Sequence, residues 1–205
     1  MTLNAEMRKK CIEMARRRAE PGAGSSGQLL RERSDVYGTP DIRKYLGDVR
    51  FAVVGGLATR LYMPERMTLD ADALIAPDSI DSAEAALAGS GCKKLGTLTI
   101  GGSTWSLPGG TNLDLIAPGG NWVGEALDST VNGPGDLPYV SLPYLVLMKL
   151  RSGRMQDLAD ISRMLGAADD DALDRTREVV GRHRASDLED LESLISLGKL
   201  EYEQE

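Results

Sequence analysis

The chain has 205 residues, of which 41% are hydrophobic and 27% charged, and these proportions exclude general disorder. Its net charge of -7 argues against nucleic-acid binding driven by counterion release over a broad surface. Because only 4% of the residues are aromatic, we expect a core of mainly aliphatic side chains.

An amphipathic helix is predicted at residues 2–19, because apolar residues recur from Leu3 to Met14 at helical spacing. A Gly- and Ser-rich stretch follows Pro21, so residues 1–39 are interpreted as a helix and a flexible link. The helix is rich in basic residues: Arg8, Lys9, Lys10, Arg16, Arg17 and Arg18. We favour a solvated helix face for them over an arm that binds RNA.

Residues 40–140 change character and predict a small mixed sheet flanked by helices, an α/β (α+β) class of fold. Short apolar runs separated by glycines and prolines indicate strands at Phe51–Val54, 69–75, 95–100, 103–106 and 113–116. Helical patterns occupy 40–46, 57–62 and 80–87. The strands at 95–100 and 103–106 are expected to form a hairpin.

Residues 141–205 predict a C-terminal helical region. Ser141 is a plausible N-cap, and a stripe from Met155 to Leu165, with Leu158 and Ile161, is expected to face the core. Two further helices are predicted at 173–180 and 188–200. The acidic run 169–171 is interpreted as a helix N-terminus, because no calcium-loop ligand pattern follows it.

Cysteine and histidine usage excludes several kinds of site. Cys11 and Cys92 fit no metal-binding spacing, and we expect them to be reduced thiols of a cytoplasmic protein. The single histidine, His183, excludes a multi-histidine metal site and leaves acid–base chemistry to carboxylates, lysines or tyrosines. No apolar run reaches the length of a membrane span, so no membrane partner is expected.

Three aspartates are the candidate catalytic and metal-ligating residues. On a strand, Asp70 and Asp72 would point to one face, where two carboxylates need a cation between them. Oxygen ligands without His or Cys suit a hard ion such as Mg²⁺, which accompanies nucleoside triphosphates. Asp114 lies in an apolar strand, and with a second ion it could activate an attacking hydroxyl.

Gly55 and Gly56 lie where the first strand gives way to a helix. Glycines allow the backbone to approach a phosphate, and the helix N-terminus offers free N–H groups. Neither the Gly-Lys-Thr phosphate loop nor the three-glycine dinucleotide pattern is present.

Together, the segment Val54–Asp72, the strand of Asp114 and the helices over 142–161 resemble the polymerase-β-like nucleotidyltransferase superfamily. The resemblance is to the small bacterial abortive-infection and toxin–antitoxin nucleotidyltransferases, and it covers about residues 50–165. The shared pattern is a Gly-Gly turn, a helix, Arg-x-Thr, Asp-x-Asp on a strand, a further Asp strand, a Lys helix and Arg-x-x-Asp-x-x-Asp. This chain has Gly56 where many relatives have serine, and Ala73 where many have a larger aliphatic residue.

The resemblance implies a nucleotidyltransferase fold and a role for each matched residue. Asp70 and Asp72 would bind two Mg²⁺ ions, and Asp114 would complete the site. The nucleotide-binding set would be Gly55, Gly56, Arg66, Thr68 and Lys149. Simpler roles stay open: Lys149 could extend from a packed helix, Arg66 could pair with an acid, and Thr68 could begin the strand. Arg154 and Asp157 are more readily explained as an ion pair three residues apart than as catalytic groups.

The leading prediction is transfer of a nucleoside monophosphate from a nucleoside triphosphate to an acceptor hydroxyl, with release of pyrophosphate. By resemblance, the acceptor would be RNA, a protein or a small molecule, and a small protein partner would fit a toxin–antitoxin or phage-defence role. The alternative is a catalytically degenerate binding or antitoxin-like module. A glycosyltransferase or an Asp-nucleophile phosphohydrolase fits less well, because of the Gly-Gly turn and the polar residues before Asp70.

Overall fold

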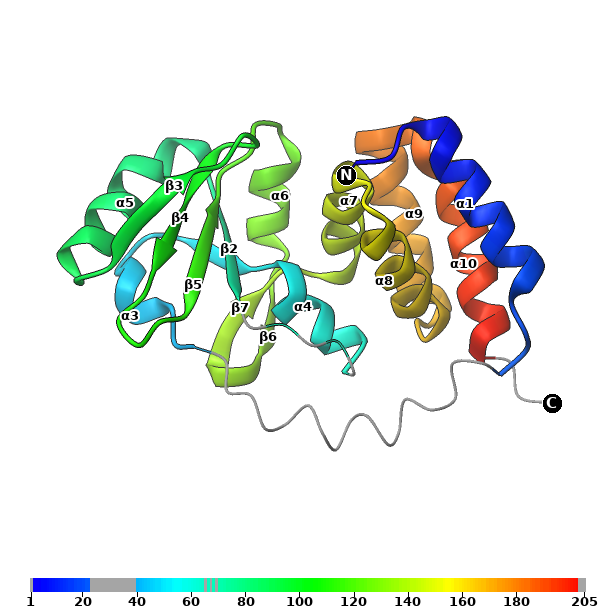
Figure 1. Ribbon diagram of the computed structural model, residues 1–205, viewed down its shortest axis with the longest axis horizontal. Coiled ribbons are helices and arrows are strands. Elements are labelled where there is room, and N and C mark those ends of the chain that lie inside the picture. The colour runs from blue at the N-terminus through cyan, green and yellow to red at the C-terminus, as the bar shows by residue number, and fades with distance from the viewer. Residues whose placement is uncertain (1, 23–39, 65, 67, 69, 203–205) are drawn as a thin grey trace. The chain divides into compact units, whose positions relative to one another are not determined.

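The structure is a computed structural model that describes residues 2–22, 40–64, 66, 68 and 70–202 (Figure 1). They form two compact units: a sheet unit of 40–61, 66, 68 and 70–141, and a helical unit of 2–22, 62–64 and 142–202. The expected mixed α/β fold with a C-terminal helical region is confirmed. In the described part of the chain, no helix has the length and apolar character needed to cross a membrane.

The described strands of the sheet unit form one seven-stranded sheet in the order β3-β4-β5-β2-β1-β7-β6. The strands are β1 (Phe51–Val53), β2 (Ala71–Ile75), β3 (Lys93–Thr97), β4 (Gly102–Ser106), β5 (Asn112–Ile116), β6 (Val131–Gly133) and β7 (Leu137–Tyr139). β2 pairs with β5 and β1 with β7 in parallel, and the other pairs are antiparallel. The predicted hairpin is therefore confirmed as β3–β4.

Side-chain alternation gives the two faces of the central strands different surroundings. Leu113 and Leu115 of β5 are fully buried, whereas Asp114 between them is only half-buried. On the buried side, Trp105 donates to Ser103 and Ser103 donates to Glu84 of α5 (Ile80–Gly89). The opposite side, which carries Asp72, Thr104 and Asp114, is called the carboxylate face below.

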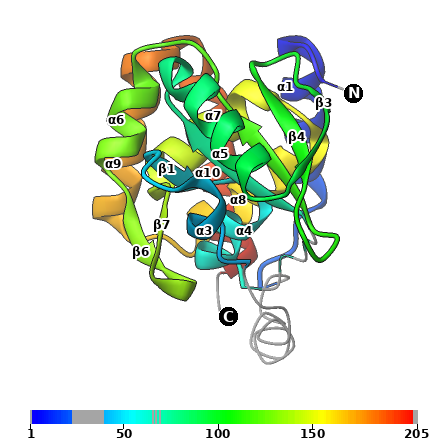
Figure 2. The ribbon, with the colours of Figure 1, turned by 90° about the vertical axis from the view of Figure 1, so that its left-hand side faces the viewer.

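The helices of the sheet unit are short. Besides α5 they are α3 (Arg43–Leu46), α4 (Gly55–Tyr62, whose last residue belongs to the helical unit) and α6 (Trp122–Asp128), with single turns at η1 (Pro77–Ser79) and η2 (Pro134–Asp136). α3 and α5 lie side by side (Figures 1 and 2). The core is mostly aliphatic as expected, with Ala52, Val53 and Leu74 wholly buried, although Tyr139 is buried too.

The helical unit contains α1 (Ala5–Arg18), α7 (Leu142–Ser152), α8 (Met155–Gly166), α9 (Asp170–Arg184) and α10 (Leu188–Tyr202), with the turn η3 (Ala185–Asp187). Asp169 caps α9 by accepting from the Ala172 N–H at 2.8 Å, so the prediction of a helix N-terminus there is confirmed. α8 and α10 cross closely, since a Cβ on Gly198 would lie 2.0 Å from the Ser162 carbonyl oxygen.

Two expectations for the helices need correction. Met155 is 53% exposed, so the core-facing stripe of α8 begins at Leu158. On α1, the solvated face does not include Arg8, whose guanidinium is buried and bonded to Asp187 and Asp190. The other basic residues of α1 are exposed: Lys9, Lys10, Arg16, Arg17 and Arg18.

Candidate active site

Asp72 and Asp114 lie directly opposite each other on parallel neighbours, β2 and β5. In-register residues of adjacent strands point to the same face, and the strands are about 4.8 Å apart. Both side chains are half-buried, flanked along their strands by buried residues such as Ala71 and Leu113. The fold thus aligns two carboxylates that the sequence separates by the whole of α5, β3 and β4.

The Gly55-Gly56 turn is packed against Asp72 and Thr68. The Val54 N–H donates to the Asp72 carbonyl at 2.9 Å, and Gly55 follows with a φ of +61°. A Cβ on Gly55 would stand 1.9 Å from Asp72 Oδ2, and one on Gly56 would stand 2.6 Å from Thr68 Cβ. Glycine is therefore required at Gly55 both by its backbone conformation and by the carboxylate beside it.

Thr104 belongs to the same row of residues and was not among the predicted site residues. It faces Asp114 from β4, and its hydroxyl donates to Asp114 Oδ1 at 2.7 Å. Counting strand pairs back from the turn between Ser106 and Asn112 would have identified the contact, because that pairing places Thr104 opposite Asp114.

The remaining residues of the predicted loop lie ahead of β2. The strand expected at 69–75 begins at Ala71, so Asp70 precedes it in an exposed bend; residue 69 is outside the described residues. Thr68 donates to the Asp70 carbonyl at 3.3 Å and contacts Gly56, while Arg66 is half-exposed. Thr68 and Gly56 are thus brought together with Gly55 and Asp72, whereas Asp70 is exposed and precedes the strand.

The donor chemistry of the carboxylate face fits a divalent cation. Asp72 and Asp114 offer oxygen atoms on one face, and two such charges repel unless a cation or a proton lies between them. Among the described residues, no three acidic, histidine or cysteine side chains converge as a metal-binding group. The geometry supports a two-carboxylate site, and the ligand role of Asp70 stays a prediction.

Lys149 belongs to the helical unit, where it is buried and bonded to acids. Its Nζ lies 2.6 Å from Asp160 Oδ2 and 3.5 Å from Asp157 Oδ1. Arg154 Nε also reaches Asp157, at 2.8 Å, which confirms the predicted ion pair three residues apart. Burial opposes ionisation of Asp157, but bonds from Arg154 and Ser152 and the charge of Lys149 together hold the pKa of that carboxyl below its usual range. The contact of Lys149 with a phosphate stays a prediction.

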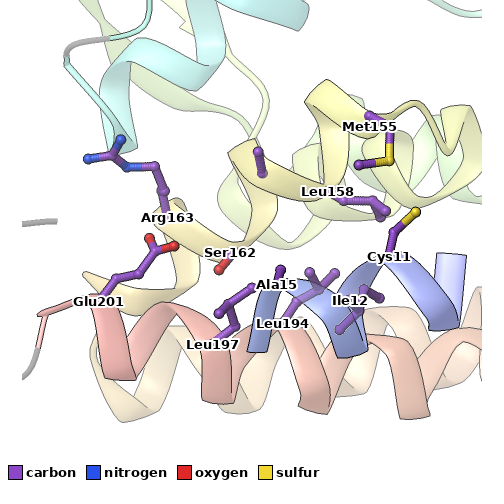
Figure 3. A pocket seen from close by; sticks show the side chains of 11 residues that line it. Cys11, Ile12, Ala15, Met155, Leu158, Ser162, Arg163, Leu194, Leu197 and Glu201 are labelled. Carbon is purple, nitrogen blue, oxygen red and sulfur yellow. The ribbon is translucent and has the colours of Figure 1, made fainter. Parts of the chain in front are cut away.

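The helical unit also contains a largely apolar pocket of about 340 Å³ between α1, α8 and α10 (Figure 3). Its lining includes Ile12, Leu158 and Leu194, and the buried Ser162 hydroxyl has no hydrogen-bond partner in the described structure. This pocket lacks the paired carboxylates of the sheet unit, which makes the carboxylate face the stronger candidate for chemistry.

Comparison with known proteins gives distant likenesses only. No protein-family model and no curated protein matches the chain. The crystal structure of ANT(2'')-Ia with adenylyl-2''-tobramycin has a TM-score of 0.44 and 15% identity over 76% of this chain and 94% of that one. A solution structure of ANT(2'')-Ia has a TM-score of 0.39 and 14% identity over 83% and 90%. JHP933 from Helicobacter pylori has a TM-score of 0.40 and 15% identity over 90% and 94%. Likeness this distant assigns no activity, so the chemistry is derived from this chain's own residues.

Proposed function

We propose that the chain is a metal-dependent nucleotidyltransferase that moves a nucleoside monophosphate from a nucleoside triphosphate to an acceptor hydroxyl. The observation that carries the proposal is the in-register pair Asp72 and Asp114 beside the Gly55-Gly56 turn. A close-approaching glycine turn at the start of α4 suits a phosphate chain, and aligned carboxylates suit the cation that accompanies it.

In this reaction the acceptor oxygen forms a bond to the α-phosphorus while the bond from that phosphorus to the pyrophosphate oxygen breaks. Asp72 and Asp114 would hold Mg²⁺, two ions by the sequence resemblance with Asp70 as a further ligand. The bound metal would stabilise charge on the attacking and leaving oxygens. Asp114 would accept the acceptor's proton. Gly55 and Gly56 would donate backbone N–H groups to the triphosphate, with Thr68 and Arg66 as further nucleotide-binding residues.

The proposal extends to the acceptor and the biological setting on the sequence resemblance alone. The acceptor is an RNA, a protein or a small molecule bearing a hydroxyl, and the setting is a cytoplasmic toxin–antitoxin or phage-defence system with a small protein partner. Incubation with Mg²⁺, α-³²P-labelled triphosphates and a cell extract tests all three acceptor classes. Nuclease and protease digestion of the labelled product then separates them.

The carboxylate pair is tested by Asp72→Asn and Asp114→Asn. Each removes a charge without changing side-chain volume, and we expect labelled product to fall by at least about a hundredfold, since each is placed on the reacting atoms. Asp81→Asn, an exposed aspartate on α5, is the matched control and should retain wild-type transfer. Equal labelling by the wild type and these three variants would contradict the proposal.

The glycine turn is tested by Gly55→Ala against Gly47→Ala. Both positions have a positive φ, at +61° and +58°, so both substitutions strain the backbone. Only at Gly55 would the new Cβ meet Asp72; at Gly47 nothing lies within 4 Å. We expect both variants to lose stability from the backbone, and only Gly55→Ala to lose transfer in its folded fraction. Equal transfer activity in Gly55→Ala and Gly47→Ala would show that the glycine turn has no part in the reaction.

The exposed position of Asp70 and the lack of a three-acid cluster among the described residues favour one second candidate, a degenerate nucleotidyltransferase-fold module that binds without transferring. Isothermal titration of the protein with Mg²⁺ and an α,β-methylene triphosphate distinguishes the enzyme from the degenerate module. The enzyme should show metal-dependent nucleotide binding that Asp72→Asn abolishes. A degenerate module should bind a partner protein and show no metal dependence.

A further inference from the structure

We propose that Thr104 is a positioning residue of the carboxylate face, which fixes the rotamer of Asp114 so that one oxygen is kept for the metal or acceptor. The inference rests on the proposed function and adds a residue to its machinery. Thr104, Asp114 and Asp72 form one row across the adjacent strands β4, β5 and β2.

The hydrogen bond itself is the first observation. The Thr104 hydroxyl donates to Asp114 Oδ1 at 2.7 Å, a length typical of a bond from a hydroxyl to a carboxylate. A hydroxyl has one hydrogen, so Thr104 engages one oxygen of Asp114 and not the other. The carboxylate is thereby held about its terminal torsion, which is otherwise broad and roughly two-fold.

The strand register makes this bond a fixed feature of the site. Thr104 is β-branched and lies in mid-strand, where the choice of side-chain rotamer is narrow. Its neighbours Ser103 and Trp105 are buried on the opposite face, so the strand cannot turn over without exposing them. Asp114 is thus flanked by a neutral donor on β4 and by a like charge, Asp72, on β2.

This arrangement assigns the two neighbours of Asp114 different tasks. Asp72 shares the cation with Asp114, whereas Thr104 touches neither metal nor nucleotide and acts through Asp114. Partners that orient a ligating carboxylate commonly matter about 10- to 100-fold in metal affinity or activity. We therefore expect loss of the Thr104 hydroxyl to weaken metal binding within that range, while the fold stays intact.

The test uses three variants of the full chain. Thr104→Val removes the hydroxyl at nearly constant shape, and Thr104→Ser restores it. Thr97→Val is the matched control, because Thr97 is an exposed threonine on the adjacent strand β3. Binding is measured by calorimetric titration of Mn²⁺ in the presence of α,β-methylene ATP, and separately the GTP, CTP and UTP analogues. Apparent kcat and KM come from transfer of α-³²P label in the cell extract that supplies the acceptor, and thermal unfolding shows that each variant is folded.

We expect Thr104→Val to weaken Mn²⁺ binding and to lower kcat by about 10-fold or more with little change in KM for the triphosphate. Thr104→Ser should recover most of both losses, and Thr97→Val should match the wild type. A purely structural role would instead lower the unfolding midpoint and scale all activities with the folded fraction. Wild-type metal binding and kcat in Thr104→Val would overturn the inference.

Asp72→Asn in the same titration separates this failure from failure of the proposed function. If Asp72→Asn loses Mn²⁺ binding and Thr104→Val does not, only the role of Thr104 is overturned. If the wild type itself shows no Mn²⁺-dependent nucleotide binding, the proposed function and this inference are both overturned.

Discussion

The two units of the chain treat buried and half-buried carboxylates in opposite ways. In the helical unit, Asp157 and Asp160 are 1% exposed and lie against Lys149. In the sheet unit, Asp72 and Asp114 are half-buried and lie in register on adjacent strands. Carboxylates bonded to a buried lysine serve stability, whereas two aspartates held in register on one half-buried face offer paired oxygen ligands to a cation.

The largest effect is expected from replacing Lys149, the lysine that Asp157 and Asp160 share. Lys149→Met would leave Asp157 and Asp160 buried without their lysine, and we expect a loss of about 3–5 kcal/mol in the free energy of unfolding. Lys9→Met, which breaks only the exposed pair with Glu189, should leave the unfolding midpoint nearly unchanged. Urea denaturation followed by circular dichroism measures both. Similar midpoints for the two variants would contradict a structural role for Lys149.

The sheet unit should be stabilised by the ligand of the carboxylate face. Mg²⁺ with the preferred triphosphate should stabilise the wild type by about 2.7 kcal/mol at a concentration one hundred times the dissociation constant. Asp72→Asn should show no such stabilisation. Thermal unfolding with each of the four triphosphates gives the shift and identifies the base. A shift that persists in Asp72→Asn would place the nucleotide elsewhere.

Acid should weaken the helical unit through Asp157. The pKa of Asp157 lies below the ordinary 3.8. Its ionised form therefore stabilises the native state at pH values above the pKa of the same carboxyl in the unfolded chain. This stabilisation is lost as the pH falls through the lower, folded pKa. Asp157→Asn should flatten the fall in unfolding free energy below about pH 4, and Asp171→Asn, an exposed control, should not.

The smallest expected effect concerns the pocket of the helical unit. Ser162 buries a hydroxyl without a hydrogen-bond partner in the described structure, so Ser162→Ala should raise the free energy of unfolding by about 1 kcal/mol. Ser196→Ala is the control, because that exposed hydroxyl bonds to the Glu192 carbonyl. A destabilised Ser162→Ala protein would show that the hydroxyl is satisfied in solution.

Local patterns were sufficient to predict most of the central strands and the long helices. The alternation around Asp114 marks a half-exposed position in an otherwise buried strand, and Asp169 followed by a helical pattern marks a cap. The strands β6 and β7 have three residues each and include Gly133 and Pro138, which leaves no period to detect. These strands were missed for lack of such a signal, whereas α6 was missed although its apolar residues Trp122, Val123, Ala126 and Leu127 recur at helical spacing.

Features that depend on distant pairing were not accessible in the same way. The sequence predicts that Asp72 and Asp114 share a site only through the family resemblance, because register between strands is a property of the folded sheet. The burial of Arg8 was missed for the same reason, because its partners lie on η3 and α10. Thr104 was missed although the pairing of the consecutive strands β4 and β5 places it opposite Asp114. The start of β2 one residue after Asp70 shows how a shift at a strand end changes the position of a candidate ligand.

The pairing of α1 with α10 bears on how the chain folds as it leaves the ribosome. Arg8 bonds to Asp187 and Asp190, which follow it by 179 and 182 residues. The contacts that bury this guanidinium therefore cannot form until nearly the whole described chain has been synthesised. The sheet unit ends at residue 141 and can complete its strand pairing earlier. The strands that carry Asp72 and Asp114 can therefore pair before the helical unit completes its contacts.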